Sequence, residues 1–160
     1  MLIRCLAMCL LLALPADAGD ISDFAPTGAY GEALKRALTK PPAEVDFASL
    51  RRDYMASPAF LAAGPMPIRI PQTLTEDEAL QILATHFPRL DVQHEAYGYF
   101  SAKTPPDPRA ELAIHHYRAI LDSIVADKKA AKDGPIFTVL SVAEEYELLA
   151  AHGLQSKQQA

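Results

Sequence analysis

Apolar side chains recur every three or four residues in six stretches of the chain, a spacing that predicts amphipathic α-helices. The apolar positions of these stretches are Tyr30, Leu34 and Leu38; Leu50 and Tyr54; Ala79, Leu80, Leu83, Ala84 and Phe87; Val92, Ala96, Tyr99 and Phe100; Ile114, Tyr117, Leu121, Ile124 and Val125; and Val142, Tyr146, Leu148 and Leu149. The longest predicted helix covers residues 109–127. Because prolines and glycines separate the stretches, the pattern predicts a mainly α-helical chain.

Several helix starts carry residues that can cap them. Asp46 and Asp91 are expected to cap the second and fourth helices, because a carboxylate oxygen accepts hydrogen bonds from the free N–H groups of a first turn. Thr75 and Glu78 have the spacing of a capping box at the start of the third helix. Arg51 and the two charged residues after it are expected to point outward. Prolines at 58, 65, 67 and 71 predict a long irregular connection.

The C-terminal part of the chain combines a predicted strand with a predicted helix. β-branched, aromatic and large apolar residues at 136–140 are typical of a short buried strand. Ser141 stands three residues before Glu144, which predicts a second capping box. We expect Tyr146 to face the core between helix and strand. Glu144 and Glu145 are expected to lie in water near the helix N-terminus, where the helix dipole favours negative charge.

A faint internal repeat runs through the helical part. The sequence Glu-Ala-Leu begins at residue 32 and again at residue 78, and a proline follows ten residues after each glutamate. This helix–turn–helix pattern is reminiscent of tetratricopeptide arrays. The predicted fold is therefore mainly α, a helical-hairpin (tetratricopeptide-like) bundle with one short C-terminal β element. The strand–helix signature of the C-terminal part covers residues 134–153.

The N-terminus has the features of a secretory signal peptide. Arg4 precedes an apolar run over residues 5–14, and Ala16 and Ala18 supply the small residues of a cleavage site. We therefore predict a Sec-type signal, residues 1–18, cleaved between Ala18 and Gly19. The rest of the chain, residues 19–160, is expected to form a single helical domain, either periplasmic or secreted.

The cysteines and the charge limit the possible chemistry. Both cysteines, Cys5 and Cys9, lie in the predicted signal, and Met8 before Cys9 disfavours a lipoprotein. The mature chain would have no disulfide and no thiolate metal site. A net charge of −5 with scattered basic residues disfavours nucleic-acid partners. No later segment is long and apolar enough to span a membrane. The sequence has no glycine-rich phosphate loop, so we predict no cofactor.

One candidate metal site lies on the longest helix. Glu111 and His115 are four residues apart and share a helix face, where a metal could bridge them. Arg118 and Asp122 continue the same stripe with alternating charge. Such alternation is typical of a solvated helix face with weak ion pairs, which we favour.

A second candidate metal set flanks a turn at Pro88. His86 and His94 could meet across this turn, with Asp91 as a third ligand. Turns between helices also carry such residues as caps. We therefore predict no metal site, and retain His86, His94, Glu111 and His115 as the residues that would form one.

Two parts of the chain resemble a known family. The run from His115 to Ile124, continued from Phe137 to Leu149, and the segment from Val45 to Pro58 resemble the bacterial family called domain of unknown function 4919. The resemblance is strongest over residues 112–154. It implies an exported bacterial protein with a helical body and a small β element, in which Ser141, Glu144, Glu145 and Tyr146 form a structural signature. It implies no activity.

These observations favour a binding protein over an enzyme. The expected function is a non-catalytic binding or accessory module of the cell envelope, whose partner is another envelope or secreted protein. One alternative is a periplasmic immunity or inhibitor protein that blocks a toxin or hydrolase. Another is a metal-binding protein or metal-dependent enzyme that uses His86, His94, His115 and Glu111.

Overall fold

The computed structural model describes residues 20–129 and 136–153, and in these residues the chain is mainly α-helical, as predicted. The described part contains seven α-helices: α1 (Ala29–Leu38), α2 (Phe47–Met55), α3 (Pro58–Ala63), α4 (Glu76–Thr85), α5 (Leu90–Ser101), α6 (Arg109–Ala126) and α7 (Val142–Ala151). Two short 3-10 helices, Ile21–Phe24 and Pro42–Glu44, complete it. The predicted signal peptide, its cleavage site and the break at Gly134 lie outside the described residues.

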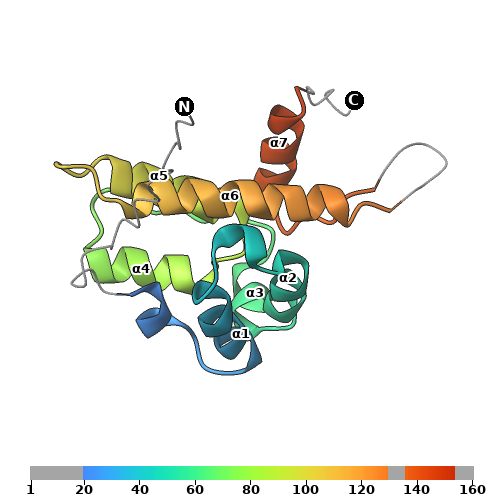
Figure 1. Cartoon of the computed structure of the whole chain (residues 1–160), viewed down its shortest axis with the longest axis horizontal. Coiled ribbons are helices and arrows are strands. Elements are labelled where there is room, and N and C mark those ends of the chain that lie inside the picture. The colour runs from blue at the N-terminus through green and yellow to red at the C-terminus, as the bar shows by residue number, and fades with distance from the viewer. Residues whose placement is uncertain (1–19, 130–135, 154–160) are drawn as a thin grey trace, which may run out of the picture.

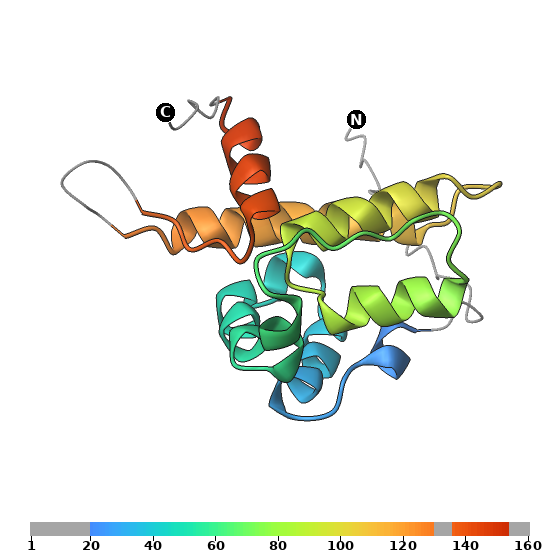
Figure 2. The same cartoon turned by 180° about the vertical axis from the view of Figure 1, so that it is seen from behind.

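The helices form a body from which α7 projects (Figure 1). α5 and α6 lie side by side and make the most extensive helix–helix contact. α1 to α4 cover one side of this pair, whereas α7 stands on the other side and packs against α5 (Figure 2). No described helix is both long enough and apolar enough to cross a bilayer.

Local signals predicted most helix starts correctly. The Asp46 carboxylate accepts from the Ser49 N–H (2.9 Å), and Thr75 and Glu78 form the predicted capping box. The prediction for Asp91 is wrong, because α5 already begins at Leu90 and the Asp91 side chain is buried. The irregular connection after residue 57 is also shorter than predicted, because α3 begins there.

The missed helix α3 has an ordinary cause. Ser57 accepts from the Phe60 N–H (3.4 Å), and Pro58 occupies the first helical position, where its missing N–H costs nothing. Pro58 therefore starts a helix of six residues instead of ending one.

The core contains the predicted apolar faces of α4 and α5, but the buried face of α6 is rotated from the predicted one. The buried positions of α6 are Ala110, Ala113, His116, Ile120 and Ile124. Of the predicted stripe, Ile124 is buried, whereas Ile114, Tyr117, Leu121 and Val125 are half-buried. Ala110 and Ala113 give this buried face small side chains, and His116 contacts Phe47 and Phe87 edge-on.

In the described residues, Ile136 of the predicted strand forms one isolated antiparallel bridge, to Lys129, in place of a longer strand. Side chains satisfy the backbone that follows. The Thr138 carbonyl accepts from Arg51 (3.1 Å), and the Leu140 N–H donates to Glu144 (2.7 Å). These two groups therefore need no neighbouring strand.

Candidate functional site

Helix α7 is attached to the body by a buried ion pair between Arg51 on α2 and Glu144 on α7. The guanidinium donates from both terminal nitrogens to the two carboxylate oxygens, at 3.0 Å each. Glu144 is 0% exposed, and Arg51 is also buried. The prediction that these two side chains lie in water is therefore wrong. A parallel two-point contact of this kind fixes orientation as well as distance.

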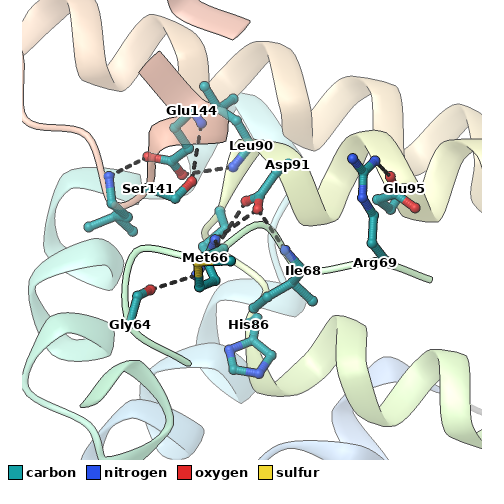
Figure 3. A network of polar contacts seen from close by, with 12 residues as sticks. Gly64, Met66, Ile68, Arg69, His86, Leu90, Asp91, Glu95, Ser141 and Glu144 are labelled. Atoms are coloured by element: carbon teal, nitrogen blue, oxygen red, sulfur yellow. Dashed lines mark hydrogen bonds and ion pairs between the residues drawn. The ribbon is translucent and has the colours of Figure 1, made fainter. Parts of the chain in front are cut away.

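Backbone groups from two further segments complete the hydrogen bonding of this pair. Glu144 also accepts from the Leu90 N–H (2.8 Å), as Figure 3 shows, and from the Leu140 N–H (2.7 Å). Arg51 also donates to the carbonyl oxygens of Pro88 (2.8 Å) and Thr138 (3.1 Å). The pair therefore joins α2, the start of α5, segment 138–140 and α7, with its charges and donors satisfied as burial requires.

The burial of Glu144 decides which face of α7 meets water. Ser141 accepts from the Glu144 N–H (3.1 Å), which confirms half of the predicted capping box, but the carboxylate bonds to Leu140 instead of reaching back to Ser141. Leu148, four residues after Glu144, is buried as well. Val142 and Tyr146 consequently point outward, with 52% and 58% of their surface exposed. The predicted core position of Tyr146 is wrong.

A second set of carboxylates, on α5, holds the chain segment before α4. Asp91 accepts from the Ile68 N–H (3.1 Å), and Glu95 accepts from the Ile70 N–H (3.1 Å). The two spacings match. Asp91 and Glu95 are four residues apart on a helix, Ile68 and Ile70 are two residues apart in extended backbone, and both separations are roughly 6–7 Å along the chain direction. Figure 3 shows Asp91 beside Ile68, and the fully buried Arg89 pairs with Asp91 at 2.8–3.0 Å.

Together these two attachments form the walls of a groove, the α5–α7 groove, with a volume of about 400 Å³. Its lining residues are Pro67, Ile68, Arg69, Asp91, His94, Glu95, Val142, Ala143, Tyr146 and Glu147. The Val142 N–H donates to the Pro65 carbonyl (3.4 Å), so the chain that leads to the exposed Met66 passes the start of α7. Exposed apolar side chains and titratable groups thus share one surface.

The polar end of the α5–α7 groove is a contact between three helices. The His94 Nδ1–H of α5 donates to Oε1 of Glu147 on α7 (2.7 Å), and the Tyr117 hydroxyl of α6 donates to Oε2 (2.7 Å). Burial first, and then the bond to Glu147, raise the pKa of Tyr117 well above its usual value. The hydroxyl therefore remains a donor at physiological pH and holds the Glu147 carboxylate in place.

The four residues retained for a metal site lie in three different surroundings. His86 contacts the Tyr54 hydroxyl (2.8 Å), and burial, followed by the charge of Arg89, lowers the pKa of His86 to about 4. His94 lies in the α5–α7 groove. On the exposed side of α6, the His115 Nε2 and Glu111 Oε1 atoms are 3.7 Å apart, as expected for the predicted solvated stripe of alternating charge. Among the described residues, no three His, Cys, Asp or Glu side chains are placed to hold a metal ion.

Apolar, acidic and basic side chains line the α5–α7 groove. None of the described residues that line it is a serine, threonine or cysteine. His94 and Glu147 form a hydrogen-bonded pair, but the lining presents no hydroxyl or thiol of these types for that pair to activate. Other hollows of the described surface include one between α1 and α2, with charged walls, and a wide one beside Tyr97 and Ser101.

The sequence pointed to His94, Glu144 and Tyr146. It did not reveal the roles of Arg69, of Tyr117 as a hydrogen-bond donor, or of Glu147 as the acceptor for Tyr117. No local pattern marks these three, because their partners come from other helices. Comparison of the chain with protein-family models gives no match. Comparisons with curated proteins and with solved structures give no match either.

Proposed function

We propose that the chain is a non-catalytic binding module of the cell envelope that holds a segment of another protein in the α5–α7 groove. The observation that carries this proposal is the outward face of α7, where Val142 and Tyr146 are more than half exposed beside Pro67 and Ile68. Burying Glu144 to hold α7 places these apolar side chains in water. Exposed apolar surface grouped beside a groove is typical of a protein-interaction site.

The size of this apolar surface fits a modest interface. Tyrosine is enriched at interface centres, because its ring buries a large area and its hydroxyl can remain hydrogen-bonded. Covering one such side chain completely contributes about 1.5–3 kcal/mol. Met66, which is 68% exposed and follows Pro65 at the start of α7, would add a flexible apolar side chain that adapts to different partners.

The envelope location rests on residues 1–18, whose sequence has the pattern of a secretory signal. A periplasmic or secreted protein would meet its partner among other exported proteins, whether that partner is an assembly component or a toxin that the chain inhibits. In the tetratricopeptide-like interpretation, the pairs α1–α2 and α4–α5 would be the two hairpin units, and a longer β element would form when the residues around Ile136 pair with another strand.

Site-specific cross-linking tests this proposal. A photo-reactive phenylalanine analogue replaces Tyr146 in the exported chain, and the same analogue at Tyr97, an exposed tyrosine on a different surface, is the control. We expect one dominant protein adduct from position 146 and none from position 97. The partner is then purified, and Tyr146→Ala should weaken its binding at least tenfold. Equal adducts from both positions, or unchanged affinity, would refute the proposal.

A further inference from the structure

The charge around the α5–α7 groove is predominantly negative. Asp91 is neutralised by the buried Arg89, which leaves Glu95 and Glu147 as the acidic lining residues. α7 also carries Glu145, which is exposed but does not line the groove. Arg69 is the one exposed arginine or lysine among the described lining residues. This surface therefore favours a cationic ligand.

The two lining carboxylates retain capacity for a further cation. Each carboxylate oxygen can accept two hydrogen bonds, and each of the four oxygens of Glu95 and Glu147 has one partner among the described residues. Arg69 contacts Glu95 at 2.6 Å, but its side chain is 74% exposed. Exposed ion pairs of this kind contribute little to stability, so a ligand cation can displace Arg69 at little cost.

A second copy of the chain is a poor occupant for two reasons. α7 has ten residues and is about 15 Å long, so two copies packed along it would bury far less than the roughly 1,200 Å² of a stable interface. Each copy would also bring a net charge of −5, with Glu145 and Glu147 on its own α7. Like charges at such a contact oppose association.

Building on the proposed function, we propose that the α5–α7 groove binds a short polypeptide segment in which a lysine or arginine stands next to an aromatic or branched apolar side chain. The apolar side chain covers Val142 and Tyr146, and the cation lies between Glu95 and Glu147. His94 and Tyr117 keep the Glu147 carboxylate oriented for this contact. The segment therefore joins α5 to α7, which already meet along this groove.

Selection from a random library of 12-residue peptides displayed on phage tests this inference with purified residues 19–160. We expect enriched peptides to combine Lys or Arg with an aromatic or branched apolar residue. A synthetic peptide from the selection should lose at least tenfold in affinity with Tyr146→Ala and at least fivefold with Glu95→Gln plus Glu147→Gln. Raising the salt concentration should weaken binding to the wild-type chain and have less effect on the double variant.

Matched controls on other surfaces separate this effect from general damage. Tyr97→Ala and Glu111→Gln change the same residue types at exposed positions outside the groove, and both should stay within twofold of wild type. Circular dichroism and the melting temperature of each variant show that it is folded. An unfolded Glu147→Gln variant would be replaced by Glu95→Gln alone, for which a threefold loss is expected.

The outcomes distinguish the two proposals. Suppose that Tyr146→Ala weakens peptide binding, but that the peptides are neutral or acidic, or that the glutamate substitutions do not change their affinity. The cationic segment is then refuted, and the binding groove stands. If no peptides are enriched, or if the enriched peptides bind equally to Tyr146→Ala, both proposals fail. Basic apolar peptides that respond to both sets of variants support both.

Discussion

Replacing Glu144 by glutamine isolates the charge of the Arg51–Glu144 pair, because the two side chains have nearly the same shape. In the variant, the Arg51 guanidinium stays buried without a balancing charge. The new amide NH2 group also faces N–H donors where an oxygen previously accepted from them. At least one buried donor therefore loses its acceptor, whichever way the amide is oriented.

The expected loss of stability is large for one substitution. Removing one partner of a buried ion pair costs about 3–5 kcal/mol, whereas a whole domain is stable by about 5–15 kcal/mol. In a domain of this size one kcal/mol shifts the melting temperature by about 2–4 °C. Glu144→Gln should therefore lower the melting temperature by on the order of 10 °C.

Urea denaturation followed by far-UV circular dichroism measures the free energy of unfolding. Glu145→Gln is the matched control, because residue 145 is exposed and its substitution should change stability by less than about 0.5 kcal/mol. Equal effects of Glu144→Gln and Glu145→Gln would refute the buried pair.

Two further predictions concern the body. A Cβ at Gly31 would lie 1.6 Å from the Pro26 carbonyl oxygen, so Gly31→Ala should cost at least about 1–3 kcal/mol in urea denaturation. Gly98→Ala on α5, with open space around it, should be neutral or stabilising by up to about 1 kcal/mol, and equal losses at both glycines would contradict the close approach. Burial, and secondarily His115, lower the pKa of His116 from 6.5 to about 4. Because folding disfavours the charged imidazole, His116 should leave stability unchanged above pH 6.5 and reduce it by roughly 3 kcal/mol as the pH falls to 4. His116→Leu should lose this part of the pH dependence, and parallel stability–pH curves for the two proteins would show that His116 titrates normally.

The parts of the fold that follow from neighbouring residues were predictable. The caps at Asp46 and Thr75 follow from residues within one turn of each helix start, and the apolar faces of α4 and α5 follow from helical period. The fold class, mainly α, needs no more than these signals.

Long-range pairing accounts for what could not be predicted. Arg51 and Glu144 are 93 residues apart, and each alone has the pattern of a solvated charge on a helix. Because these two side chains pair inside the protein, α7 is oriented with Tyr146 facing water. This orientation is the opposite of the predicted one. The contact of His94 with Glu147 likewise depends on where α7 docks, and no periodicity within α5 or α7 encodes it.

Thiol accessibility tests the orientation of α7 most directly, because residues 19–160 contain no cysteine and every introduced thiol reports on one position. Val142→Cys, Tyr146→Cys and Leu148→Cys would be reacted separately with a thiol reagent under native conditions. The first two should react nearly as fast as a free thiol, and Leu148→Cys on the order of a hundredfold more slowly, because it must wait for local opening. Slow reaction at position 146 with fast reaction at position 148 would contradict the orientation and, with it, the α5–α7 groove.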